Sequence, residues 1–123
     1  MRVLLSIKPE FALKIFNGEK KFEFRRSIFK NEKVKKVIVY ASYPTQKVIG
    51  EFEIEEILND DLQSLWQKTK EHAGIKEEYF YEYFSDKQKG YAIKIKSVKK
   101  YKRPVCLREK FKTNPPQSFS YLY

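Results

Sequence analysis

Alternation of apolar and charged residues in two segments is the feature that most limits how this 123-residue chain folds. In residues 47–57 (KVIGEFEIEEI), apolar side chains alternate with glutamates, and the alternation slips by one position around Gly50. In residues 90–98 (GYAIKIKSV), tyrosine and isoleucines alternate with lysines. A period of two is typical of strands that bury one face, and a glycine at a slip predicts a bulge. Both segments therefore predict strands with one charged, open face.

Three more segments have the composition of strands, and a helix is predicted between the first two of them. Proline is favourable in the first turn of a helix, and glycine is favourable just after its end, so Pro9 and Gly18 mark the limits of this helix. Apolar residues recur between them at helical spacing. The predicted strands cover residues 2–7, 20–26 and 34–42.

Two short helices are predicted to interrupt the strands, over residues 60–72 and 77–84, with Asp60 or Asp61 as the first cap. Five or so strands with a two-helix insertion predict an α+β fold, namely a small, mostly antiparallel β-barrel formed by residues 1–123 as one domain. An aromatic tail begins at Pro115-Pro116. We expect this tail to fold back over the barrel and to bring Gln117 or Ser118 to a cleft.

The charge distribution indicates a polyanion as a partner. The chain has 26 Lys and Arg residues against 16 Asp and Glu residues, a formal net charge of +10. Residues 51–86 contain eleven acidic and three basic residues, so the positive charge lies in the rest of the chain. An uneven field steers polyanions to one face, and phosphate contacts dominate nucleic-acid affinity. The alternative is a solvated lysine surface, and the acidic residues of 60–86 are a second predicted surface, for a protein partner.

Several classes of protein are not expected from this composition. No apolar run approaches the roughly 20 residues that a membrane helix needs. The opening residues MRVLLSIKPEF have no small-residue cleavage pattern, so they are interpreted as a strand and not as a signal peptide. Cys106 is the only cysteine and His72 the only histidine. We therefore expect no disulfide, no metal site and no cofactor, in a cytoplasmic protein.

The segment 18–26 carries the predicted binding site. If it is extended, Phe22 and Phe24 point to the core side, while the charged residues that alternate with them point to the open side. Lysine supplies a point charge, arginine a planar fork for oxygens, and glutamate an acceptor for base amino groups. The alternative interpretation is a row of surface ion pairs, each worth about 0–1 kcal/mol.

The chain contains Ser6-Ile7-Lys8-Pro9, then the predicted helix, and then the string Gly18-x-Lys20-x-x-Glu23-x-Arg25. This arrangement resembles the signature of the ASCH domain, a branch of the PUA-like superfamily. Residues 40–42 and 48–52 are also similar to the third and fourth strands of that family. The resemblance implies a PUA-like barrel whose cleft binds RNA or nucleotides. A regulatory module, in which the acidic helices recruit a protein, is a separate alternative. The predicted ligand-binding residues are Ser6, Lys8, Lys20, Glu23, Arg25 and Arg26.

Four of these residues have a predicted role in binding. Lys8, at the start of a helix, and Arg26 hold phosphates. Glu23 accepts a hydrogen bond from a base edge or positions Arg25, which forks onto ligand oxygens. For Ser6, a hydroxyl group bonded to the backbone is the alternative.

Some relatives with the same signature are enzymes, which gives a second hypothesis. One branch hydrolyses the amide of N4-acetylcytidine with the motif lysine, a threonine three residues later and a distant glutamate, and RNA cleavage is associated with other ASCH proteins. Lys20 matches that lysine, but Glu23 stands in place of the threonine, and a carboxylate does not replace a hydroxyl nucleophile. The alternative function is therefore a nucleoside amidohydrolase or a ribonuclease in which Lys20 and Glu23 are an acid/base pair.

A second basic segment, residues 94–103, combines five lysines and one arginine with Tyr101, and Tyr91 lies just before it. Cations for phosphates and rings for bases are typical of single-strand binding. The alternative is an edge strand that lysines protect from aggregation.

Overall fold

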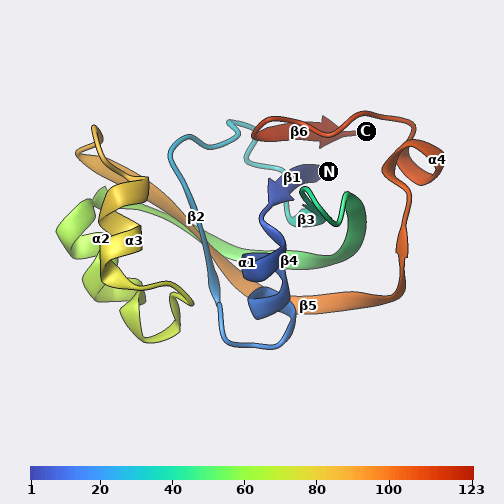
Figure 1. Ribbon diagram of the computed structural model, residues 1–123. Coiled ribbons are helices and arrows are strands. Elements are labelled where there is room, and N and C mark those ends of the chain that lie inside the picture. The colour runs from blue at the N-terminus through green and yellow to red at the C-terminus, as the bar shows by residue number, and fades with distance from the viewer.

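Two long strands, β4 (Lys47–Asp61) and β5 (Lys89–Val105), form an antiparallel ribbon that runs through the whole protein (Figure 1). The computed structural model describes all residues, 1–123. Both strands begin where the alternation predicts, but each continues well beyond it. The extra residues of β4 pair with the start of β5, from Leu58↔Ala92 to Asp61↔Lys89, and those of β5 pair with the first half of β4, as in Gly50↔Lys100.

The sheet has six strands in the order β2-β5-β4-β3-β1-β6. β1 pairs with β3 in parallel, and the other four pairings are antiparallel. The α+β class and the mostly antiparallel sheet are therefore confirmed, but the predicted barrel closure is wrong. β2 and β6 remain the two open edges, because β2 is only four residues long and pairs only with β5. The remaining strands are β1 (Arg2–Ile7), β2 (Phe22–Arg25), β3 (Lys36–Ala41) and β6 (Phe119–Leu122).

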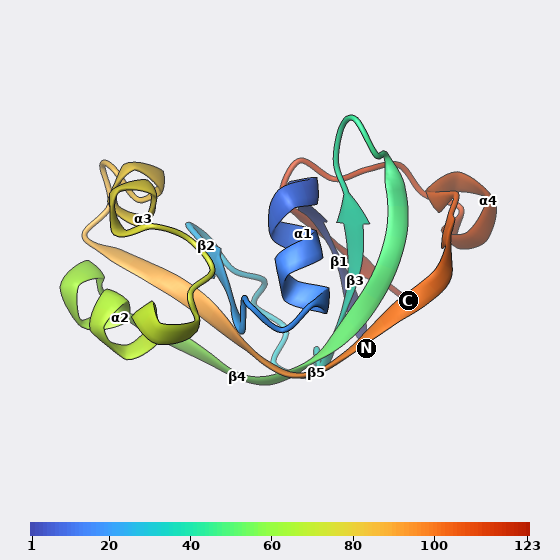
Figure 2. The ribbon, with the colours of Figure 1, turned by 60° about the horizontal axis from the view of Figure 1, so that its bottom comes forward.

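Gly50 lies where the ribbon bends around the helix α1 (Pro9–Phe16). The pairing of β4 with β5 shifts register between Val48 and Gly50, which confirms the predicted bulge. A Cβ atom at Gly50 would lie 2.6 Å from the ring of Phe16 and 2.6 Å from the carbonyl oxygen of Lys99. Only glycine allows the helix to approach the ribbon this closely, and Figure 2 shows α1 on the concave side of the bent sheet.

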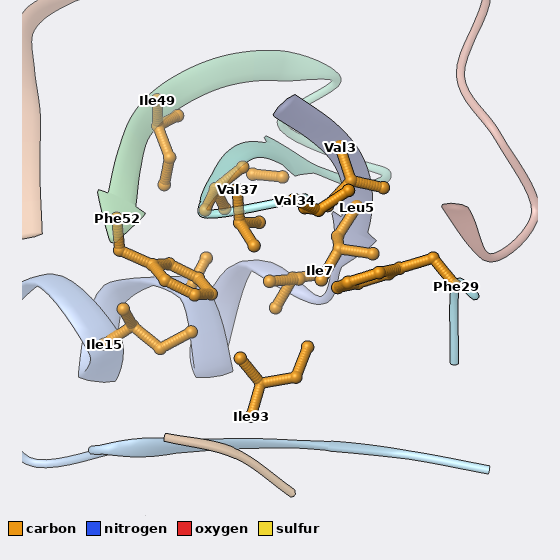
Figure 3. Close-up of a cluster of buried hydrophobic side chains, with 13 residues drawn as sticks. Val3, Leu5, Ile7, Ile15, Phe29, Val34, Val37, Ile49, Phe52 and Ile93 are labelled. Carbon is orange, nitrogen blue, oxygen red and sulfur yellow. The ribbon is translucent and has the colours of Figure 1, made fainter. Parts of the chain in front are cut away.

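The largest core cluster lies between α1 and this concave face. Side chains of β1, β3 and β4 point toward Ala12 and Ile15 of the helix, and Ile93 of β5 closes the cluster from the opposite side (Figure 3). Gly18 follows the end of α1 with a positive φ of 88°, as predicted. The helix thus returns the chain directly to β2, which lies beside β5.

The predicted two-helix insertion is present at one end of the ribbon (Figure 1). It consists of α2 (Leu62–Thr69), the short 3-10 helix η1 (Lys70–His72) and α3 (Glu77–Tyr83). The carboxylate of Asp61 caps α2 by accepting from the Ser64 backbone N–H at 2.9 Å. A second core cluster joins these helices to β2, with Phe22 and Phe24 packed against Leu65, Trp66, Ala73, Phe80, Phe84 and Ala92.

The C-terminal segment contains two elements that the sequence patterns did not predict. α4 (Leu107–Phe111) is a five-residue helix, and Lys112 leaves it in the left-handed region at φ 58°. The aromatic tail then forms β6, which pairs antiparallel with β1 from Arg2↔Leu122 to Leu5↔Phe119. The two termini are consequently neighbours. No helix of the protein has the length and apolar character needed to cross a membrane.

Candidate functional site

A cavity of about 220 Å³ lies between the end of β1, α1, β2 and α3. One end of the tail that leads to β6 also reaches it. Five of the six predicted ligand-binding residues line this cavity. Its walls are formed by Ser6, Ile7, Lys8, Phe11, Lys20, Glu23, Phe24, Arg25, Ile75, Tyr79, Tyr83 and Gln117.

The three charged residues of the signature, Lys20 before β2 and Glu23 and Arg25 within it, are buried rather than displayed on an open surface. Lys20 is 3%, Glu23 6% and Arg25 9% exposed. Phe22 and Phe24 belong to the core cluster beneath α2 and α3, as the alternation predicts. Because Glu23 and Arg25 alternate with them, they face the cavity side. The interpretation of this segment as a row of exposed ion pairs is therefore wrong.

Both Nη groups of Arg25 donate hydrogen bonds within the protein. Its Nη1 donates to Glu23 Oε2 at 3.2 Å and to the Ser6 carbonyl oxygen at 3.5 Å. Its Nη2 donates to the carbonyl oxygen and the hydroxyl of Ser118 at 3.1 and 2.8 Å. Arg25 thus joins both sheet edges and the end of β1, which leaves neither Nη atom free for the predicted fork onto ligand oxygens.

Ser6 has the backbone-bonded role that was its alternative interpretation. Its hydroxyl donates to the Pro116 carbonyl oxygen at 2.7 Å. Together with the contact between Arg25 and Ser118, this bond fixes the tail across one side of the cavity. Gln117 lies between the two attachment points and lines the cavity, as expected for this tail.

Lys20 is the buried cation of the site. Its Nζ donates to the Ala73 carbonyl oxygen at 2.9 Å and lies over the ring of Phe24, 4.6 Å from the centroid. Burial lowers the pKa of Lys20 from 10.5 to about 8; the charge of Glu23 opposes this shift and that of Lys14 adds to it. A lysine with this pKa is mostly protonated at neutral pH and loses its proton more readily than an ordinary lysine.

Aromatic rings from α1 and α3 form the opposite wall. The rings of Phe11 and Tyr79 meet edge to face with centroids 5.2 Å apart, and the rings of Tyr79 and Tyr83 are nearly parallel. Lys8 Nζ donates to the Tyr79 hydroxyl at 3.5 Å. The Tyr83 hydroxyl donates to the Phe24 carbonyl oxygen at 3.2 Å, and burial raises the pKa of Tyr83. The cavity therefore combines flat apolar surfaces with cations.

Sequence reasoning missed this aromatic wall. The segment EEYFYEYF was assigned to a helix with an acidic, outward surface. A signal was present, because Tyr79 and Tyr83 are four residues apart and so share one face of that helix. Only the fold shows that this face lies against the cavity and not against solvent.

Arg26 is the one predicted ligand-binding residue that does not line the cavity. Its guanidinium group donates to the Tyr83 carbonyl oxygen at 3.0 Å and forms an ion pair with Asp86. Arg26 therefore fastens β2 to the end of α3.

Comparisons with known proteins give consistent results. The family described as "Domain of unknown function (DUF365)" matches residues 1–114. A protein named "ASCH domain-containing ribonuclease" from Zymomonas mobilis is 32% identical over 123 residues, which cover 97% of this chain and 82% of that protein. The crystal structure of ASCH from Zymomonas mobilis superimposes with a TM-score of 0.91 at 31% identity, covering 99% of this chain and 87% of that chain.

A further relative is much longer than this chain. A protein named "Large ribosomal subunit protein uL22" from Ureaplasma parvum is 33% identical over 121 residues. These residues make up 98% of this chain but only 39% of that protein. The likeness is therefore to one part of the longer protein.

Proposed function

The chain belongs to the ASCH domain family and to the family of unknown function that matches its first 114 residues, and from this premise we propose that it binds single-stranded RNA in the cavity around Lys20. The observation that carries the proposal is a buried lysine held between aromatic rings at a cavity wall. A cation attracts a phosphate, and flat rings give bases a surface for stacking. Both are present here within one small cavity.

The size of the cavity limits what enters it. At about 220 Å³ it is smaller than the roughly 300–1,000 Å³ of most ligand pockets. We therefore propose that a single nucleotide is inserted, with its base against Phe11 and Tyr79 and its phosphate near Lys20 and Lys8. Glu23 faces the same space and would accept from a base amino group or a ribose hydroxyl. Arg25 would position Glu23 and the tail, since its Nη groups already have protein acceptors.

Cleavage of the bound strand is the second candidate function, and two observations favour it. The Zymomonas relative carries the name ribonuclease, and the pKa of Lys20 near 8 suits a group that transfers protons close to neutral pH. Protonated Lys20 would also stabilise the negative charge that develops on the phosphate.

The proposed reaction needs only groups of the cavity, the RNA and water. Glu23 accepts the proton of the ribose 2′-hydroxyl, whose oxygen then attacks the adjacent phosphorus. The bond between phosphorus and the 5′-oxygen breaks, and Lys20 gives its proton to that oxygen. The products are a 2′,3′-cyclic phosphate and a 5′-hydroxyl end. Proton transfer from Glu23 to Lys20 through water restores the starting state.

Binding is tested with fluorescently labelled single-stranded RNA and a series of salt concentrations. The affinity of the wild type falls as salt rises. Lys20→Met weakens binding about tenfold or more, because a hydrogen bond to a charged group is worth about 1.5–3 kcal/mol. Lys21→Met is the matched control, since Lys21 is the exposed neighbour in sequence. Binding that ignores salt, or that is unaffected by Lys20→Met, overturns the proposal.

Cleavage is tested by identifying the ends of the products. RNA should yield 2′,3′-cyclic phosphate, and the same strand with a single 2′-deoxynucleotide should resist cleavage at that position. Glu23→Gln should abolish cleavage and leave binding measurable. If RNA remains intact while N4-acetylcytidine loses its acetyl group, the amidohydrolase is the correct reading. If neither reacts, the cavity binds without turnover.

Other assignments from the sequence stay as proposals. We propose that residues 1–123 act as one ASCH domain, since a single six-stranded sheet runs through them. A cytoplasmic location stays a proposal that rests on the single cysteine. The acidic residues of 60–86 remain a predicted protein-binding surface. Replacing one exposed acidic residue of this surface with its neutral amide should leave the affinity for RNA unchanged.

A further inference from the structure

A second hollow, which we call the ribbon groove, lies on the other side of α1. It has a volume of about 330 Å³. Pro9 and Leu13 of α1 form one wall, and the end of β5 forms the other. Its lining residues are Pro9, Leu13, Ala41, Thr45, Ile49, Lys100, Tyr101, Lys102 and Pro104. The floor is apolar, and Leu13 is 51% exposed beside it.

The ribbon groove carries two cations without anionic partners. Lys100 and Lys102 both line the groove, in the part of β5 where its pairing with β4 shifts register. Neither residue forms an ion pair, whereas Lys94 earlier in the same strand pairs with Glu55 at 3.0 Å. Lys94 is the one cation of β5 with a glutamate partner, so the charges of Lys100 and Lys102 are free to meet an anionic ligand. A site with apolar floor and free cations is complementary to a sugar-phosphate chain.

The first turn of α1 separates the ribbon groove from the cavity around Lys20. Lys8 and Phe11 line the cavity, while Pro9 and Leu13 line the groove. Figure 2 shows α1 with β2 and α3 on one side and β3 with the first part of β4 on the other, while the ribbon passes beneath the helix. A helix with its side chains is about 10–12 Å across, so an extended strand of a few nucleotides spans this distance.

We propose that the ribbon groove binds the phosphates of single-stranded RNA that flank the nucleotide held in the cavity, with Lys100 and Lys102 as the contacting cations. The inference rests on the proposed RNA binding and adds the path of the strand across the protein. Tyr101 takes no part in stacking, because its ring packs in the core cluster of Leu4, Ile38, Tyr40, Val48, Leu107 and Leu122.

The competing explanation is that these lysines only protect an exposed strand edge from aggregation. Beyond its pairing with β2, which ends at Lys94, the second half of β5 has a strand on one side only. Lysines on such an edge deter aggregation without binding anything. The two explanations differ in whether the length of the RNA matters, and this difference defines the experiment.

Affinities are measured for a nucleoside monophosphate and for a single-stranded RNA of about eight nucleotides, a length within the usual site sizes. The double variant Lys100→Gln/Lys102→Gln should bind the oligonucleotide about tenfold more weakly and the monophosphate unchanged. Its salt slope should fall in magnitude by about 1.4, as two lost phosphate contacts predict for single strands. Lys87→Gln/Lys89→Gln removes the same charge from two exposed residues outside both hollows and is the control.

The outcomes separate the two proposals. If the wild type binds neither probe, or Lys20→Met changes neither affinity, the proposed RNA binding fails and the groove proposal fails with it. If Lys20→Met weakens the binding of both probes but the Lys100/Lys102 variant has the affinities of the wild type, only the groove proposal is overturned. If the control variant weakens binding of the oligonucleotide equally, the loss of affinity is an effect of net charge. That result also overturns the groove proposal.

Discussion

Lys20 is a charged side chain in a place that water hardly reaches. In the folded protein the lost hydration of this charge is replaced in part by a hydrogen bond to the Ala73 carbonyl oxygen and by contacts with the ring faces of Phe11 and Phe24. These contacts do not replace full hydration, because the pKa of Lys20 falls to about 8. A shift from 10.5 corresponds to about 3 kcal/mol of lost stability while the lysine is charged. A cost of this kind is typical of residues retained for function.

Replacing Lys20 with methionine should change how stability depends on pH. The folded state binds the Lys20 proton more weakly than the unfolded state, so the contribution of Lys20 to the free energy of unfolding is constant below about pH 8 and increases between pH 8 and 10.5. Urea denaturation should show this increase, about 3 kcal/mol in all, for wild type relative to Lys20→Met. Lys21→Met should retain the wild-type profile. Parallel profiles for wild type and Lys20→Met would contradict the assigned pKa.

The pair of Arg25 and Glu23 should behave as a coupled unit in a double-mutant cycle. Arg25→Met leaves the buried carboxylate of Glu23 without its cation, which should lower the free energy of unfolding by about 3–5 kcal/mol. Glu23→Gln keeps the size of the side chain, and in its background the loss from Arg25→Met should be smaller. Denaturant titrations of the four proteins give the coupling. Strict additivity would show that the ion pair contributes nothing.

The sequence motif located these residues but not their surroundings. Glu23 and Arg25 are two residues apart, so alternation along a strand placed them on one face, whereas Lys20, three residues before Glu23, was placed at the site only by the family signature. Their burial depends on Ala73 and Ser118, which are 53 and 93 residues away from their partners. The spacing of residues in the sequence does not indicate such long-range contacts. The hydrogen bonds that engage the Nη groups of Arg25 could therefore not be predicted.

At the scale of elements, the turn between η1 and α3 determines the shape of the cavity. The backbone N–H of Lys21 donates to the His72 carbonyl oxygen at 2.8 Å, and Lys14 Nζ donates to that of Gly74 at 3.1 Å. The turn is thus attached to both α1 and the start of β2. Lys20 lies directly beneath it, because Gly74 has no side chain to occupy that space.

Gly74→Ala tests this arrangement, with Gly18→Ala as the matched control. Both glycines have a positive φ, so both substitutions carry a backbone cost of about 1–2 kcal/mol. A Cβ atom at Gly74 would also lie 2.6 Å from Lys20 Cβ, whereas one at Gly18 meets nothing within 4 Å. Thermal or urea denaturation should therefore show the larger loss for Gly74→Ala. Equal losses would mean that the turn moves away from Lys20 easily.

The elements that sequence patterns predicted are those with strong local signals. Pro9 and Gly18 bounded α1, and the Asp61 cap began α2. α4 was missed because five residues provide little more than one helical turn and no clear periodicity. β6 was predicted only as a tail that folds back, since its strand conformation depends on pairing with β1, at the other end of the chain.

At the scale of the whole molecule, the cavity lies where parts of the chain that are distant in sequence meet. β1 and α1 supply one wall, the helical insertion supplies another, and the tail before β6 crosses between them. The barrel was predicted from the number of strands, but strand number does not determine closure. The two open edges are joined by side chains instead, through Arg25 and Ser118. An open sheet of this kind leaves room for the cavity.

The most direct test of the central claim is the pKa of Lys20, measured by NMR of its ε-carbon with and without a nucleoside monophosphate. We expect a pKa near 8 in the free protein and a higher value in the complex, because a bound phosphate stabilises the charged form. By linkage, the affinity for the nucleotide should then fall as pH rises through that range. A pKa at the ordinary value of 10.5, or one that saturating nucleotide leaves unchanged, would contradict the account.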